Sequence, residues 1–69
     1  MFKFGDIVKV RCGFYEGLYG MVIDEIKRLH VPTEYTVDGT ISTKNYSVVH
    51  IQRDFQEGEL IKIKEIENG

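Results

Sequence analysis

Residues 5–26 read GDIVKVRCGFYEGLYGMVIDEI, and this stretch decides the fold. Apolar and polar side chains alternate over residues 7–12, which predicts a strand with one buried face. Three glycines follow at fixed spacing: Gly13, Gly17 and Gly20. Glycine reaches positive φ without steric cost and lets two backbones pass close together, so the chain is expected to turn back tightly here. The apolar segment 21–26 predicts the returning strand, with a bend or bulge near Asp24 and Glu25.

The middle of the chain continues this rhythm of short strands and turns. Asp38-Gly39 lies between the β-forming segments 34–37 and 40–43, and this dipeptide is typical of tight hairpin turns. Residues 44–45 start another turn. The segment 34–43 is therefore expected to form a hairpin.

In the last third of the chain, the residue pattern predicts one strand without ambiguity. Residues 46–51 fit both a short strand and an irregular crossing segment, and a polar loop anchored by Phe55 is expected at 52–58. Residues 60–64 read LIKIK, whose alternation predicts a final strand. Five or six short strands in so short a chain predict an all-β fold, a small barrel that removes its own sheet edges.

The chain has 69 residues, and we expect a single domain over residues 1–69. A domain of this size buries only about 60% of the surface that its unfolded chain exposes. The single cysteine, Cys12, excludes an internal disulfide, and its place in the first predicted strand suggests a small core residue. No apolar run approaches the roughly 20 residues of a membrane span, and nothing resembles a secretory signal. We expect a soluble protein of the reducing cytoplasm with no membrane partner.

The first third of the chain resembles the KOW motif of NusG-type transcription factors and several ribosomal proteins. In that motif, Gly-Asp-x-Val-x-Val leads into a glycine-rich loop and then into Gly-x-Val, as residues 5–10 and 20–22 do here. The resemblance implies an SH3-like barrel of about five antiparallel strands, in which the first and last strands lie side by side. From residue 27 onward, only a general SH3-like or Tudor-like rhythm is similar.

In such a barrel, cations of the first and last strands would share the outer face: Lys9, Arg11, Lys62 and Lys64. They would form a positive stripe that contacts phosphates or an acidic protein surface. The alternative is an ordinary solvated face with balanced charges. The formal net charge of −2 weighs against nucleic acid, because domains that neutralise phosphates usually carry a basic surplus.

Large apolar residues crowd the glycine-rich segment: Phe14, Tyr15, Leu18 and Tyr19. Such side chains stack on unpaired bases or anchor protein interfaces. The alternative is that Phe14 and Leu18 plug the end of the barrel, while Tyr15 at the expected loop tip serves recognition. RNA-binding members of the resembled family usually carry lysine or arginine in this loop. Glu16 stands here instead, and it favours a protein partner.

No residue pattern supports catalysis, a metal site or a cofactor. One cysteine and two histidines about 20 residues apart lack the ligand spacing of a closed zinc site. The adjacent Asp24 and Glu25 point to opposite faces of a strand, so they form no acid/base pair. No Walker-type lysine follows the glycines, and the loop leads into a strand and not into a helix N-terminus.

The sequence therefore predicts a non-enzymatic binding module that recognises a macromolecular partner. A protein of the transcription or translation machinery is favoured, with RNA as the alternative. A small phage-type effector that inhibits a host complex is a further alternative. Five residues are expected to shape turns: Gly13, Gly17, Gly20, Asp38 and Gly39.

Overall fold

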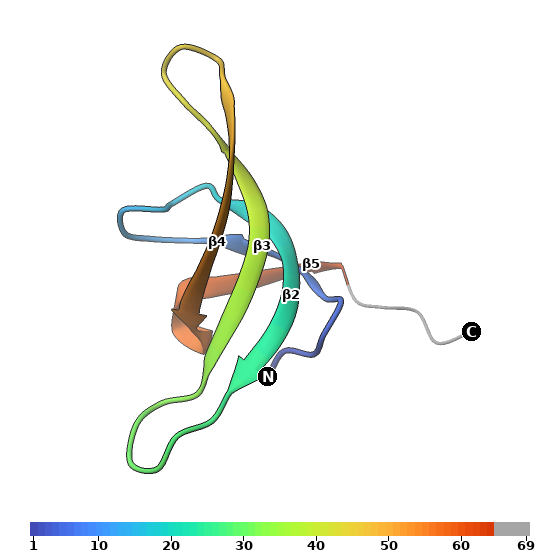
Figure 1. The fold of residues 1–69 in the computed structure, drawn as a ribbon, viewed down its shortest axis with the longest axis vertical. Helices are drawn as coiled ribbons and strands as arrows, with labels where there is room; N and C mark the ends of the chain where they lie inside the picture. The colour runs from blue at the N-terminus through green and yellow to red at the C-terminus, as the bar shows by residue number, and fades with distance from the viewer. Residues whose placement is uncertain (65–69) are drawn as a thin grey trace, which may run out of the picture.

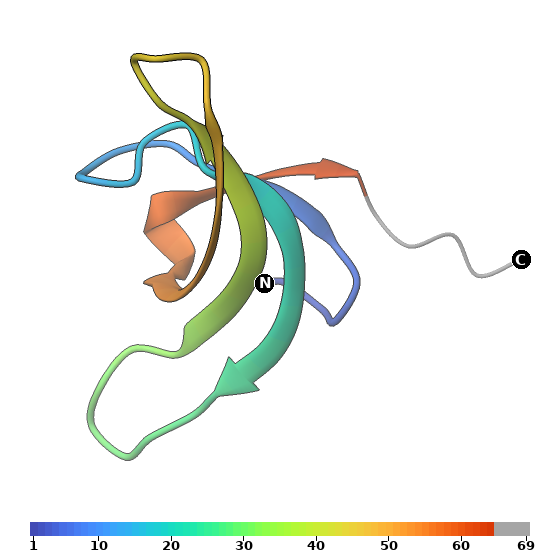
Figure 2. The same ribbon diagram turned by 45° about the horizontal axis from the view of Figure 1, so that its top comes forward.

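The computed structural model describes residues 1–64, which form one antiparallel sheet of five strands. The strands are β1 (Ile7–Val10), β2 (Tyr19–Ile26), β3 (Glu34–Ser42), β4 (Val48–Gln56) and β5 (Leu60–Lys64), with a short 3-10 helix, η1 (Glu57–Glu59), before β5. Their order is β4-β3-β2-β1-β5, so β4 and β5 are the edges of the sheet (Figure 1). β2 and β3 are long and strongly curved (Figure 2). The expected all-β fold is confirmed, and the arrangement is that of a small SH3-like β domain.

The first and last strands lie side by side and antiparallel, as expected, with Val10 paired to Leu60. β2 pairs with β1 on one side and with β3 on the other. Its register with β3 shifts between Val22 and Asp24. This confirms the irregularity expected near Asp24.

The hairpin expected at Asp38-Gly39 is wrong, because both residues lie in the middle of β3. Gly39 pairs with Gly20 of β2, and the two backbones touch. A Cβ atom at Gly20 would lie 2.8 Å from the Asp38 carbonyl carbon and closer still to its oxygen. Gly20 is therefore needed for the close approach of two strands and not for a turn.

The turn between β3 and β4 lies at residues 43–47. The Thr43 amide donates to the Ser47 carbonyl over 2.8 Å, and the Tyr46 amide donates to the Thr43 carbonyl over 2.9 Å. Tyr46 adopts a φ of 61° to close this turn. The turn expected to start at residues 44–45 is confirmed.

β4 and η1 replace the polar loop expected at residues 52–58, which corrects that expectation. The polar side chains bond to the neighbouring strand: the Thr36 hydroxyl donates to the Asp54 carboxylate over 2.6 Å. Phe55, the expected anchor, is buried and pairs with Tyr35. An edge strand carries polar side chains on both faces, so its sequence resembles that of a loop.

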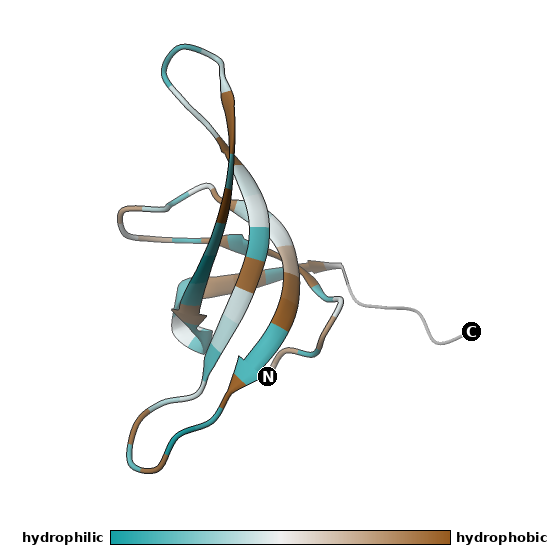
Figure 3. Ribbon diagram, in the orientation of Figure 1, coloured by the Kyte–Doolittle hydropathy of each residue, from teal (hydrophilic) through white to brown (hydrophobic). Residues whose placement is uncertain are grey.

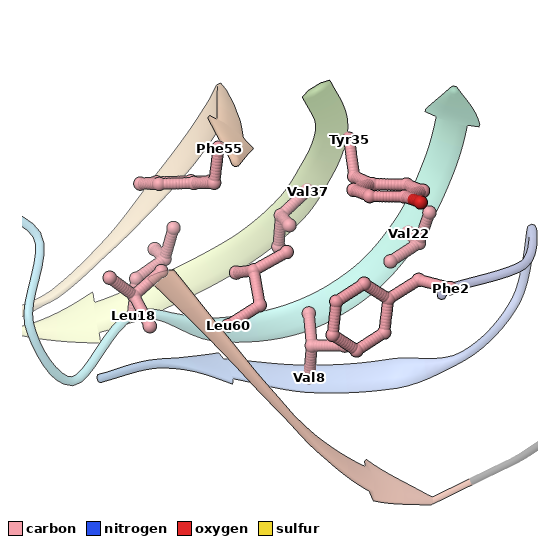
Figure 4. Packing of buried hydrophobic residues seen from close by; sticks show 9 residues of the cluster. Phe2, Val8, Leu18, Val22, Tyr35, Val37, Phe55 and Leu60 are labelled. Carbon is pink, nitrogen blue, oxygen red and sulfur yellow. The ribbon is translucent and has the colours of Figure 1, made fainter. Parts of the chain in front are cut away.

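Nine buried side chains form the core on the concave side of the sheet (Figure 4). They come from the N-terminal segment, the glycine-rich connection and all five strands: Phe2, Val8, Val10, Leu18, Val22, Tyr35, Val37, Phe55 and Leu60. The rings of Phe2 and Tyr35 meet edge to face, with centroids 5.2 Å apart. Along the strands, hydrophobic and hydrophilic segments follow one another (Figure 3). The core takes two residues each from β1 and β3 and one each from β2, β4 and β5.

Cys12 is exposed, which corrects its expected place in the core. β1 ends at Val10, and the next amide, that of Arg11, donates to the Glu59 carbonyl over 2.9 Å. Because the strand has ended, the alternation no longer directs residue 12 inward.

Gly20→Ala should lower the free energy of unfolding by at least about 2 kcal/mol, because the added methyl group collides with the backbone of β3. Gly58→Ala is the matched control, since a Cβ atom there has no neighbour within 4 Å. Its cost should stay within about 0.5 kcal/mol. Urea denaturation measures both variants, and equal stabilities would contradict the close contact of β2 and β3.

Candidate recognition surface at the glycine loop

The glycine loop, defined here as residues 11–18, is held by its own backbone hydrogen bonds. Two overlapping turns, Gly13–Glu16 and Tyr15–Leu18, are closed by amide-to-carbonyl bonds of 3.1 and 2.9 Å. The Gly17 amide donates to the Val10 carbonyl over 2.9 Å, which ties the loop to the end of β1. The loop is therefore preformed and needs no partner to order it.

Gly13 and Gly17 provide the backbone conformation of this loop. Their φ angles are 85° and 96°, in the region that side-chain-bearing residues rarely adopt. A Cβ atom at either position would meet nothing within 4 Å. The requirement for glycine is therefore conformational, and the turn role expected for both residues is confirmed.

A row of three aromatic rings runs from the core to solvent through this loop. Tyr15 packs edge to face on the buried Phe55, with centroids 5.9 Å apart. Phe14 packs edge to face on Tyr15 at 5.0 Å. Tyr15 is half-buried, whereas Phe14 is 91% exposed. The core thus supports a ring that stands almost entirely in solvent.

Arg53 of β4 fixes Tyr15 from a second direction. Its Nε donates to the Tyr15 hydroxyl over 3.0 Å, and its guanidinium carbon lies 5.6 Å from the ring centroid. Its Nη1 donates to the Gln52 carbonyl over 2.9 Å. Among the described side chains, no carboxylate forms an ion pair with this guanidinium. A positive charge therefore lies beside Tyr15, the ring that supports Phe14.

Of the four apolar candidates, Phe14 and Tyr15 lie together in the structure. Leu18 and Tyr19 lie apart from them. Leu18 is fully buried, as a barrel plug, while Phe14 is not. Tyr19 is the first residue of β2, is half exposed and pairs with Lys9 on the outer face. Successive residues of a strand point to opposite faces, so Leu18 and Tyr19 cannot share a surface.

Arg53 and Phe55 are the members of this surface that sequence reasoning missed. They are two positions apart on β4 and so lie on one face, but the sequence predicted a loop here and gave no sign of it. Their contact with Tyr15 spans 38 residues between Arg53 and Tyr15. It follows from the curvature of the sheet, for which the sequence holds no local signal.

The expected stripe of four cations is not formed, because the register of β1 and β5 divides it. Lys9 is exposed on the outer face and stands opposite Ile61. Lys62 stands opposite the buried Val8, so it points to the inner side. Residues opposite one another in an antiparallel pair share a face, and Lys9 and Lys62 therefore lie on different faces.

Of the other two cations of the expected stripe, the structure places only the side chain of Arg11. Arg11 lies beyond the end of β1 and is exposed. Lys64 pairs with Ile7 through its backbone after a shift in register, and its side chain lies outside the described part of the structure.

Lys62 pairs with the buried Asp6, with 3.3 Å between Nζ and Oδ2. The same carboxylate oxygen accepts the Lys3 amide over 2.9 Å, and the ammonium lies 5.8 Å from the centroid of the Phe2 ring. Asp6 is 1% exposed, so this charge depends on its partners. The pair ties the N-terminal segment to β5.

The other features of residues 1–64 give weaker support for a functional site. No group of three or more His, Cys, Asp or Glu side chains within residues 1–64 is placed to hold a metal ion, and no helix in this range is long and apolar enough to cross a bilayer. A hollow of about 320 Å³ has a mixed lining: Met1, Pro32, Thr33, Tyr35, Gln56, Glu57 and Gly58. Its one charged side chain, Glu57, already bonds the N-terminal ammonium at 2.9 Å.

Comparisons with protein-family models, with curated proteins and with solved structures find no match to this chain. The glycine loop is therefore interpreted from its own geometry.

Tyr15→Ala should lower the free energy of unfolding by about 2 kcal/mol, because it removes a half-buried ring that packs on Phe55 and accepts a hydrogen bond from Arg53. Tyr46→Ala is the control, since that ring is 94% exposed, and it should change stability by less than about 0.5 kcal/mol. Thermal melting compares the two. A wild-type melt for Tyr15→Ala would mean that the ring does not support the loop.

Lys62→Gln should destabilise the fold by about 3 kcal/mol, because it takes the cation away from a buried carboxylate. Lys9→Gln removes an equal charge from the outer face, where side chains stand in solvent, and should cost less than about 0.5 kcal/mol. Chemical denaturation of both variants gives the comparison. A small loss for Lys62→Gln would contradict the dependence of the fold on this ion pair.

Proposed function

We propose that this chain is a non-enzymatic binding module that recognises a protein partner through the glycine loop. The observation that carries the proposal is the ring of Phe14, 91% exposed at the end of a row of rings that begins in the core. Aromatic side chains are the commonest anchors of protein interfaces because they bury much area with few rotatable bonds.

The loop also has the rigidity that such an anchor needs. Its two turns are closed by backbone hydrogen bonds, and Tyr15 is held by Phe55 and Arg53. A preformed loop loses little conformational entropy on binding, so more of the contact energy contributes to affinity.

The charge of Arg53 indicates which chemical groups a partner should carry. Arg53 donates from Nε to Tyr15 and from Nη1 to Gln52, and within the described residues its Nη2 amine makes no hydrogen bond. An apolar pocket for Phe14 with a carboxylate nearby would match both groups. The resemblance to KOW domains is the basis for placing this partner in the transcription or translation machinery.

RNA is the second candidate, and one observation favours it. Exposed aromatic rings beside an arginine also form stacking platforms for unpaired bases. Against it stand the net charge of −2, Glu16 in the loop and the divided cations of β1 and β5.

Immobilised protein exposed to lysate, with and without nuclease, should retain the same partner in both arms. Phe14→Ala should weaken this retention by about 2 kcal/mol, roughly thirtyfold, without changing the melting temperature, because the ring is 91% exposed. Phe4→Ala is the matched control, since Phe4 is another exposed phenylalanine, 65% exposed, away from the loop.

The two variants and the two arms separate the alternatives. Loss of all retained material after nuclease treatment would replace the protein partner with RNA. Equal retention by Phe14→Ala and wild type would remove the glycine loop as the recognition surface.

A further inference from the structure

β4 is an edge strand that stands in solvent on both faces for most of its length. Of its nine residues, Phe55 alone is buried and Ile51 is half-buried. Val48 and Val49 are 67% and 41% exposed, although both are strong strand formers. Figure 1 shows that the β3–β4 hairpin extends beyond the rest of the sheet, and Figure 3 shows hydrophobic segments on this part of β4. Such an edge is a template for a further strand.

The hydrogen-bond pattern shows which residues of β4 face the open edge. The Thr43 amide donates to the Ser47 carbonyl, so these two residues form a hydrogen-bonded pair at the turn. Hydrogen-bonded pairs alternate along an antiparallel ladder, and the register of β3 with β4 continues without a shift. Odd-numbered residues of β4 therefore bond to β3, while residues 48, 50, 52 and 54 turn their amides and carbonyls outward. Gln56 fits this phase, since its amide donates outside the sheet to the Glu59 carboxylate over 2.8 Å.

We propose that β4 pairs with β4 of a second copy of this chain, antiparallel and two-fold symmetric about Gln52. The outward-facing groups of the two copies then form a continuous ladder, and one surface serves both copies. In this register His50 of each copy lies opposite Asp54 of the other. Polar side chains at facing positions can interact across a strand pair, and here the imidazole–carboxylate pair occurs twice.

Neighbouring registers match less well. Pairing about His50 places each His50 opposite itself, and pairing about Arg53 places two guanidinium groups opposite each other. Pairing about Ile51 leaves Asp54 opposite the apolar Val48. The register about Gln52 is thus the one that places the imidazole of each copy opposite a carboxylate of the other.

Contacts within each copy already hold the two paired side chains on the outer face. The His50 imidazole Nε2 is hydrogen-bonded to the Asp38 carboxylate of β3. The Asp54 carboxylate accepts the Thr36 hydroxyl over 2.6 Å. Both side chains are therefore oriented before the second copy arrives, which lowers the entropy lost on pairing.

Sedimentation equilibrium over a wide range of protein concentrations tests the proposal. Wild type should pass from monomer to dimer, and Gln52→Pro should weaken the dimer at least about tenfold. Proline removes an outward amide and leaves the bonds between β4 and β3 in place, which is the position where an edge strand tolerates it. Gln52→Ala keeps the amide and should dimerise like wild type. A wild-type chain that stays monomeric throughout, or a Gln52→Pro dimer of unchanged affinity, overturns the proposal.

Hydrogen exchange of wild type gives a second test that needs no variant, in case Gln52→Pro does not fold. At low concentration the amides of residues 50, 52 and 54 should exchange fast, and those of 51 and 53 slowly. Raising the concentration should slow exchange at 50, 52 and 54. Unchanged exchange at these three amides while the protein dimerises would place the interface elsewhere and overturn the assignment to β4.

Discussion

The contact between the backbones of β2 and β3 at Gly20 and Gly39 is the constraint on which the rest of the structure depends. No side chain at either position keeps the two strands apart, so their backbones touch here, and both strands are strongly curved (Figure 2). This curvature turns Phe55 of β4 back over the core and towards the glycine loop. Without it, the five strands would form a flatter sheet, and the concave side that holds the nine core residues would be open to water.

The position of the exposed Phe14 ring depends indirectly on the curvature of the sheet. Tyr15 is held between Phe55 and Phe14, and Phe55 reaches it because the sheet curves. A domain of this size has a small margin of stability, and an exposed phenylalanine contributes little to it. The loop nevertheless contains two glycines with positive φ, and it holds that ring in solvent. A strained loop that presents an exposed aromatic ring is more typical of a binding site than of a core.

The sequence predicted those parts of the fold that local patterns determine. Alternation located β1 and β5, and the glycines located the first loop. Asp38-Gly39 was misinterpreted because glycine serves two purposes, positive φ in a turn and close approach in a sheet, and only the pairing with Gly20 distinguishes them. The cation stripe failed because the pairing of β5 with β1 places Lys62 opposite the buried Val8 and Lys9 opposite Ile61, and the sequence of one strand does not contain its register.

Arg53 links the glycine loop to the open edge of β4. Its Nε holds the Tyr15 hydroxyl while its Nη1 covers the Gln52 carbonyl, one of the acceptors that pairing with a second copy would use. If the amide of the second copy competes with Nη1 for that carbonyl, the guanidinium gains another donor for a carboxylate of the partner. Pairing of β4 would then strengthen recognition at the loop, and by linkage a partner that draws Arg53 away from Gln52 would strengthen pairing by the same factor. One side chain, bonded to both surfaces, is thus sufficient to couple self-association to partner binding.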